Sequence, residues 1–205
     1  MLIHAKEKKE RSLGIRLGLK AHRCNSPKCV MIRRPYRPGE HGKARRRAPS
    51  EFGSQLSEKQ KLMTTYILRD RALEKIFIKA LRASGAVGDT VLAFLERRLD
   101  NVVFRLGLAP SRIVARQVIG HGHIFVNGKK VTVPSYETKV GDVISIRPLS
   151  INLLPFRDLR DTLKKYEPPV WFSFDIENLS GKVLSLPRDI EQPFDINLVV
   201  DYYSK

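Results

Sequence analysis

The sequence has few of the features that mark secreted or membrane proteins. Its 205 residues include only two cysteines, Cys24 and Cys29, too few for the disulfide framework of a small secreted protein. The longest uninterrupted apolar stretch, Val91 to Leu95, is far too short to span a bilayer. The N-terminus has no apolar core of a signal peptide and too many acids for a typical transit peptide. We therefore expect a soluble, cytoplasmic protein.

Acidic residues are also scarce. Only 21 Asp and Glu stand against 38 Lys and Arg, which gives a net charge of +17. Such a charge repels itself, and a polyanionic partner is the usual reason that it is tolerated. An anionic membrane would require a lipidation signal or a basic amphipathic helix, and the sequence shows neither. Because 42% of the residues are hydrophobic, the chain is expected to fold and to bind nucleic acid rather than lipid.

The positive charge is concentrated early in the chain. Residues 1–71 carry a net charge of +13, residues 72–167 carry +7, and residues 168–205 carry −3. The C-terminal segment also holds the only tryptophan, Trp171, and the apolar run from Ile196 to Val200. We expect this segment to pack on the body of the protein rather than to meet phosphate.

Residues 1–50 lack hydrophobic periodicity and are rich in Arg, Lys, Pro and Gly. Prolines fix φ and remove backbone donors, so an extended loop with turns is predicted here. A solvated tail is the alternative, but the prolines, Tyr36 and His41 favour a segment that becomes ordered on RNA. Its candidate RNA-binding residues are Arg33, Arg34, Arg37, His41, Lys43, Arg45, Arg46 and Arg47.

The next segment is predicted to be helical. From Ser57 to about Ser84, apolar residues recur every three to four positions, with an interruption at Asp70. Lys59 and Lys61 lie on the first of these helices and are added to the RNA-binding candidates.

The clearest unit spans roughly residues 89–147. One helix is predicted from Leu92 to Leu106, and a second helix begins after Ser111, its expected N-cap. Asn127-Gly128 is a strong signal for a β-hairpin turn, and residues 143–146 form a further strand. The fold class is therefore α+β: a small module of two helices and a β-hairpin beside a helical lobe with a basic N-terminal extension.

Basic and polar residues lie on both helices and at the turns of this module. A structured RNA is recognised through its shape, phosphates, 2′-hydroxyls and splayed bases, which requires many donors on a rigid frame. Arginine suits this because its planar fork pairs with phosphate oxygens and stacks on bases. The candidate contacts are Arg97, Arg98, Asn101, Arg105, Arg112, Arg116, Gln117, His121, His123, Lys129 and Lys130.

At these residues the sequence resembles a known family, that of protein four of the small ribosomal subunit. Residues 95–131, LERRLDNVVFRLGLAPSRIVARQVIGHGHIFVNGKKV, carry the pattern of its small RNA-binding module. Residues 23–42, 57–66, 169–175 and 198–205 are similar to the same bacterial protein. The resemblance covers nearly the whole chain from about residue 20, in the same order.

The resemblance implies a ribosomal protein that binds small-subunit rRNA directly. Such a protein organises a junction in the 5′ domain, nucleates subunit assembly and influences decoding accuracy. Its implied partners are neighbouring ribosomal proteins, notably protein five, and messenger RNA where it enters the subunit. The implied division is a basic N-terminal extension (1–44), a helical lobe (45–90) joined by residues 168–205, and the module (91–167).

Three single motifs allow other interpretations. Arg98-Leu99-Asp100 is similar to the signature of pseudouridine synthases, but no catalytic domain accompanies it, so Asp100 is expected to pair with neighbouring arginines. Cys24 and Cys29 match the second half of a four-cysteine zinc site found in some relatives. Two free thiols are favoured, and a mixed site with His4 or His22 stays open. His121 and His123 flank Gly122 in a turn beside arginines, which favours phosphate contact over metal binding.

We therefore expect no enzyme activity and no cofactor. The alternative function is a free-standing RNA-binding regulator, or a heat-shock-type factor, acting on messenger RNA or stalled ribosomal particles. Retention in small subunits after a high-salt wash would distinguish a ribosomal protein from such a factor.

Overall fold

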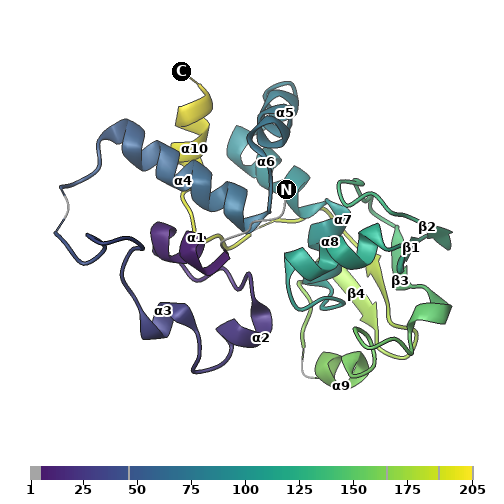
Figure 1. Ribbon diagram of the computed structural model, residues 1–205. Helices are drawn as coiled ribbons and strands as arrows, with labels where there is room; N and C mark the ends of the chain where they lie inside the picture. Colours follow the sequence, from purple (N-terminus) through teal and green to yellow (C-terminus); the bar gives the residue numbers. More distant parts are fainter. Residues whose placement is uncertain (1–5, 46, 165, 189, 205) are drawn as a thin grey trace. The chain divides into compact units, whose positions relative to one another are not determined.

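The computed structural model describes residues 6–45, 47–164, 166–188 and 190–204. The chain divides into two compact units (Figure 1). The first comprises residues 1–92 and 190–205, and the second comprises residues 93–189. Helices dominate the first unit, and the second combines helices with a five-stranded sheet, which confirms the predicted α+β class.

The first unit begins with three short helices, where the sequence predicted a loop. These are α1 (Lys6–Leu13), α2 (Ala21–Cys24) and α3 (Val30–Arg33). The turn after α1 is held by the buried carboxylate of Glu10, whose Oε1 accepts hydrogen bonds from the backbone N–H groups of Leu17 (3.0 Å) and Leu19 (3.2 Å). Residues 34–45 and 47–50 then run without regular structure, as the prolines predicted.

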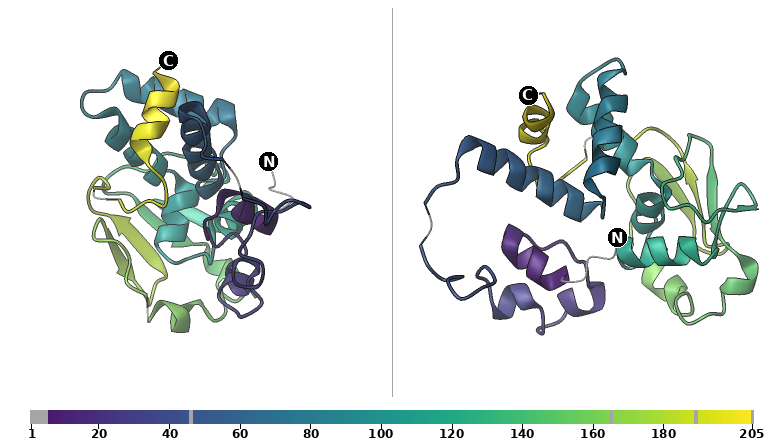
Figure 2. Two further views of the ribbon diagram at one scale, coloured as in Figure 1. Left: turned by 90° about the vertical axis from the view of Figure 1, so that its left-hand side faces the viewer. Right: turned by 45° about the horizontal axis from the view of Figure 1, so that its top comes forward.

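The body of the first unit is built from helices α4 (Glu51–Thr65), α5 (Asp70–Leu81) and α10 (Ile196–Tyr203), together with the start of α6 (Val87–Glu96). The predicted break at Asp70 is confirmed, although α4 begins six residues before Ser57 because Ser50 caps it, accepting from the Gly53 N–H. The C-terminal helix α10 lies against α4 (Figures 1 and 2). Its Tyr203 ring stacks on Phe77 of α5 at a centroid distance of 4.3 Å.

Lys59 lies inside this helical core. Only 6% of the residue is exposed, and its Nζ lies 2.7 Å from Asp70 Oδ1. The same ammonium lies 4.3 Å and 5.1 Å from the ring centroids of Tyr202 and Tyr203. Burial alone would lower the pKa of Lys59, but the hydrogen bond to Asp70 and the tyrosines raise it overall. Burial raises the pKa of Tyr203 to about 12.

The second unit begins with a break in the predicted helix. The sequence predicted one helix from Leu92 to Leu106, but α6 ends at Glu96 and α7 (Leu99–Arg105) follows after Arg97 and Arg98. Arg98 is extended, with φ −68° and ψ 137°, and forms a β-bridge with Glu137. The first N–H groups of α7 donate to the carbonyls of Tyr136 (2.8 Å) and Pro134 (3.1 Å). Residues 134–136, more than 30 positions later in the sequence, therefore hold the start of α7 apart from the end of α6.

The other local predictions for the module are confirmed. Helix α8 (Arg112–Gly120) begins after Ser111, whose hydroxyl accepts from the Val114 N–H at 3.3 Å. Strands β1 (Ile124–Val126) and β2 (Lys129–Lys130) flank a tight turn at Asn127 and Gly128, where both residues have positive φ (50° and 76°). Positive φ at both central positions defines the type I′ hairpin turn. Strand β3 is Val143–Ile146, as predicted.

The sheet is larger than the sequence predicted. Strands β4 (Phe172–Asp175) and β5 (Ser180–Val183) extend it, and the strand order is β2-β1-β3-β5-β4, with every neighbouring pair antiparallel. The Gly181 Cα lies so close to α7 that an added Cβ would be 2.4 Å from the Leu106 side chain. A short 3₁₀ helix (η1, Pro148–Ser150) and helix α9 (Leu159–Leu163) connect β3 to β4.

The unit boundaries therefore differ from the implied division. Residues 168–205 were assigned as a whole to the helical lobe, but residues 168–188 belong to the second unit and only the end of the chain belongs to the first. The physical reason is the pairing of β5 with β3, in which Ile144 faces Gly181. That pairing buries Val183 and Phe172 in the module.

Candidate nucleic-acid interface

Glu96 is the centre of one ion network in the second unit. Its side chain is completely buried, and its carboxylate accepts two hydrogen bonds from Arg105, from Nε and Nη2, both at 3.0 Å. The Asn101 Nδ2 also donates to this carboxylate. Arg112 Nη2 lies 4.0 Å from Glu96 Oε1. A fully buried carboxylate needs such partners to offset its desolvation.

Arg112 is held on three sides. Its Nε donates to Asn101 Oδ1 at 2.7 Å, and its guanidinium carbon lies 4.5 Å above the Phe104 ring centroid. With Glu96 on the remaining side, only 13% of the side chain is exposed. This arginine therefore joins the start of α8 to α7 and has little rotational freedom.

Asp100 is the centre of a second network. Both of its oxygens accept from Arg98, at 3.2 Å and 2.8 Å, and Arg116 Nε lies 3.3 Å from Asp100 Oδ2. The expectation that Asp100 pairs with neighbouring arginines is confirmed. Arg112 and Arg116 lie one turn apart on α8, so the two networks join the helices at two successive levels.

Exposure divides the predicted contacts on these helices into two groups. The side chains of Arg105 and Arg116 are 25% and 30% exposed, so part of each remains accessible at the surface. Arg98 and Asn101 are only 7% and 1% exposed, because their polar atoms are turned inward to Asp100, Glu96 and Arg112. We therefore correct their expected role: they support the arginine network rather than contact a ligand.

Arg97 is intermediate in exposure and serves the same support. Its Nε donates to the Thr138 carbonyl at 3.0 Å, while its own carbonyl accepts from the Thr138 N–H and hydroxyl. The segment that contains Glu137 and Thr138 is therefore bonded to both Arg97 and Arg98, the two residues between α6 and α7.

The rim of the module is exposed. Gln117, His121, Lys129 and Lys130 all lie at the surface of the second unit. Gly122, with φ +76°, allows the Lys130 side chain to cross this turn, since an added Cβ would be 2.2 Å from the Lys130 Cε. Lys130 is therefore held beside the two histidines.

His123 is partly buried beneath this rim. Its Nδ1 lies 2.9 Å from the buried Ser150 hydroxyl, and its ring packs edge-on against Phe156. Burial lowers the pKa of His123, and the positive charges of His121, Arg147 and Lys130 lower it further. The neutral form of the imidazole is thus favoured.

In the first unit, the predicted contacts of the N-terminal extension are exposed. These are Arg33, Arg34, Arg37, His41, Lys43, Arg45 and Arg47. Arg46 lies outside the described residues. Lys61 is paired with Glu58 at 2.6 Å, and Lys59 is buried, so we correct Lys59 from a ligand contact to a core residue.

Arg11 was missed in the sequence analysis. Its guanidinium donates to the carbonyls of Arg34 (3.1 Å), Tyr36 (2.9 Å) and Arg37 (3.3 Å), and it lies 4.9 Å from the Tyr36 ring centroid. It therefore shapes the loop that displays the basic residues. No local pattern marks it, because its partners lie more than 20 residues away. A cleft of about 390 Å³ is lined here by Glu7, Lys8, Arg11, Arg23, Val30, Arg33, Arg34 and Pro38.

Cys24 and Cys29 are both buried free thiols. Burial raises the pKa of Cys24, which favours its protonated form. Within the described residues, no group of three or more His, Cys, Asp or Glu side chains is placed to hold a metal ion. His4 and the His22 side chain lie outside what the structure describes.

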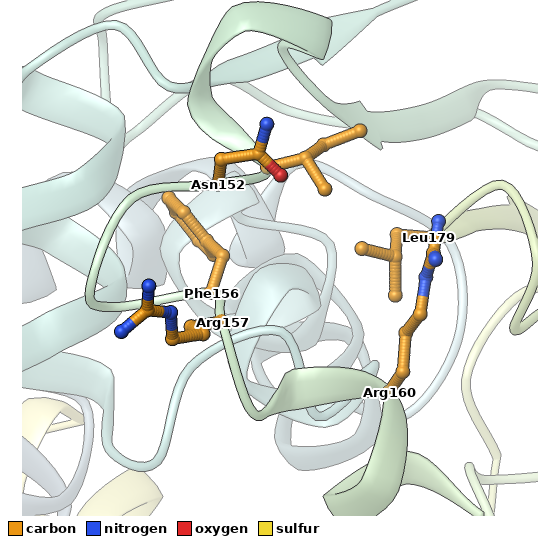
Figure 3. Close-up of a pocket in the computed structure, with 6 residues that line it drawn as sticks. Asn152, Phe156, Arg157, Arg160 and Leu179 are labelled. Carbon is orange, nitrogen blue, oxygen red and sulfur yellow. The ribbon is translucent and has the colours of Figure 1, made fainter.

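A second cavity, of about 210 Å³, lies in the second unit, and none of the arginines of the two networks lines it (Figure 3). Its lining residues are Ile151, Asn152, Phe156, Arg157, Arg160 and Leu179. Phe156 and Leu179 form a floor that is almost fully buried, and Phe156 supports His123 from beneath.

In the described part of the chain, no helix is long and apolar enough to cross a membrane.

Two protein-family models match consecutive parts of this chain and indicate its class. Residues 1–96 match the family model of the ribosomal protein S4/S9 N-terminal domain, and residues 97–144 match that of the S4 domain. This combination defines a structural, non-enzymatic protein built on an S4 RNA-binding domain.

The relatives give the family. The chain is 45% identical to the small ribosomal subunit protein uS4 of Thermus thermophilus over 194 residues, which cover 94% of this chain and 93% of that protein. With the same coverage it is 46% identical to uS4 of Ruminiclostridium cellulolyticum and 41% identical to uS4 of Desulfitobacterium hafniense. The chain belongs to the uS4 family of small ribosomal subunit proteins, which confirms the resemblance found in the sequence.

Proposed function

We propose that this protein binds the 5′ domain of small-subunit rRNA directly and helps to nucleate assembly of the subunit. The observation that carries the proposal is the arrangement of Arg105, Arg112 and Arg116. All three guanidinium groups are held by acidic or amide side chains on a rigid pair of helices. Arginines fixed in this way lose little side-chain entropy when they meet phosphate oxygens.

The exposed rim adds further donors around this fixed centre. The module would contribute the exposed Gln117, His121, Lys129 and Lys130 together with the half-buried His123, and the N-terminal extension would contribute a separate set of basic side chains. RNA recognition by shape needs many such contacts at once. The excess of 38 Lys and Arg over 21 Asp and Glu supports a polyanion as the ligand.

Finer roles belong to the same proposal and rest on membership in the uS4 family. They are contacts with neighbouring proteins of the small subunit, notably protein five, an effect on decoding accuracy, and proximity to messenger RNA where it enters the subunit. We place the protein in the cytoplasm, within the small subunit.

The test is binding of the purified chain to a 5′-domain rRNA transcript over a salt series, against an unrelated structured RNA of equal length. If Z phosphates are neutralised, log affinity falls against log salt with a slope of roughly −0.7Z to −0.9Z. We expect tight binding that survives the competitor and weakens in Arg112→Ala. Equal affinity for the two RNAs would overturn the proposal of specific rRNA binding.

A further inference from the structure

Two acidic side chains lie in the middle of the basic cluster. Glu96 and Asp100 have side chains that are 0% and 4% exposed. Glu96 lies beside Arg105 and Arg112, and Asp100 lies beside Arg116, three arginines that we propose to meet RNA. A carboxylate near a phosphate-binding surface repels phosphate by simple electrostatics. If the carboxylates act only by repelling phosphate, removing their charge should raise the affinity for RNA. If they hold the arginines in place, removing it should lower the affinity.

The geometry shows what the carboxylates do to the arginines. Glu96 takes two parallel hydrogen bonds from Arg105, which fixes the plane of that guanidinium. Each Arg105 nitrogen that faces Glu96 is thereby committed inward, so the remaining N–H groups of the fork face away from Glu96. Asp100 does the same for Arg98 and takes Arg116 on its second side. The helices and the arginines are thus held in one arrangement before any ligand arrives.

The charge balance of the cluster remains positive. Four arginines, Arg98, Arg105, Arg112 and Arg116, surround the two carboxylates. With four arginines against two carboxylates, these six side chains carry a formal charge of +2, the sign that attracts phosphate.

We propose that Glu96 and Asp100 are positioning residues for RNA binding. They increase the affinity for RNA although their negative charge has the same sign as that of the RNA phosphates. The inference rests on the proposed function and goes beyond it, since both carboxylates are buried and would act only through the arginines. A disordered arginine loses rotamer freedom on binding, and fixing it in advance removes that cost.

The test compares isosteric neutral variants of the full-length chain, with the 5′-domain rRNA transcript as probe. Glu96→Gln and Asp100→Asn keep the shape but lose the charge, and the exposed acids Glu167 and Asp158 supply matched controls. We expect Glu96→Gln and Asp100→Asn to weaken binding by roughly 10-fold, the scale of one lost charged hydrogen bond. Glu167→Gln and Asp158→Asn should bind as tightly as the original chain or slightly more tightly.

A double-mutant cycle identifies the route of the effect. If Glu96 acts through Arg105 and Arg112, then Glu96→Gln should weaken binding much less when both arginines are already Ala, because coupled residues are not additive. Equal weakening in the two backgrounds would contradict positioning. Unchanged or tighter binding by Glu96→Gln alone would overturn the proposal outright.

A further variant separates the loss of arginine positioning from a general loss of folding. Arg105→Lys keeps the net charge but cannot form two parallel bonds to Glu96. Positioning predicts that it binds nearly as weakly as Arg105→Ala, while a requirement for charge alone predicts wild-type affinity and would refute the inference. Thermal melts check that each variant is folded at the assay temperature. If the original chain does not distinguish the two RNAs, the proposed function fails first, and that result is distinct from a failure of positioning.

Discussion

Asn101 and Arg112 join the two helices of the module. The Asn101 Oδ1 accepts from Arg112 Nε at 2.7 Å, while the amide Nδ2 of the same residue donates to the Glu96 carboxylate. Asn101 is only 1% exposed, so both polar ends of its side chain are satisfied within the protein. A single buried amide thus connects α6, α7 and α8.

The first prediction follows from that bridge. Asn101→Ala leaves Glu96 and Arg112 each short of one partner, and leaving buried charged groups under-bonded costs about 1–3 kcal/mol. We expect the free energy of unfolding to fall by this amount and the RNA affinity to fall with it. Urea unfolding and rRNA binding of the same sample check both. A variant with unchanged stability and weaker binding would instead place Asn101 in direct contact with RNA.

The second prediction concerns Lys59. Lys59→Met removes the ion pair with Asp70 and the contacts with Tyr202 and Tyr203, so we expect a loss of about 1–2 kcal/mol in stability. The slope of log affinity against log salt should stay the same, because the buried ammonium meets no phosphate. Lys75→Met, at an exposed position of α5, is the control for stability. A smaller salt slope in Lys59→Met would return this residue to the RNA contacts.

Local signals in the sequence were sufficient for much of the module. Asn127-Gly128 specified the hairpin turn, Ser111 specified the start of α8, and the short segment Val143–Ile146 after a Gly-Asp turn specified β3. Each of these features depends on residues within a few positions of one another. They could therefore be predicted without knowing what the chain packs against.

The features that were missed depend on distant partners. The break between α6 and α7 is made by the carbonyls of Pro134 and Tyr136, and β5 is a strand because it pairs with β3, whose residues lie 35 to 39 positions earlier. The helical spacing correctly placed Arg112 and Arg116 on one face. It did not predict that Glu96 pairs with Arg105, since nine positions separate them and only the break brings them together.

The third prediction uses the pKa of His123. Because burial and neighbouring positive charges lower it below 6.5, the unfolded state binds the proton more readily than the folded state. The stabilising contribution of His123 is therefore complete above pH 6.5 and is lost as the pH falls through the folded pKa. Histidine titration by NMR should give a midpoint below 6.5 for His123. In His123→Gln, the fall in melting temperature on acidification should be smaller than in the original chain, and a midpoint at or above 6.5 would contradict the burial argument.

The fourth prediction concerns the contact between the sheet and α7. An alanine at Gly181 would place its Cβ 2.4 Å and 2.7 Å from the two Leu106 methyl carbons, and Leu106 is fully buried. Overpacking of a closed core costs about 1–3 kcal/mol, so Gly181→Ala should lower the melting temperature by several degrees. Gly120 is the matched control, because an added Cβ there meets nothing within 4 Å. The arginines are carried by the helices that Leu106 anchors, so RNA affinity should fall in Gly181→Ala and not in Gly120→Ala. Equal stability of the two variants would show that Leu106 moves aside and that the sheet does not fix the position of α7.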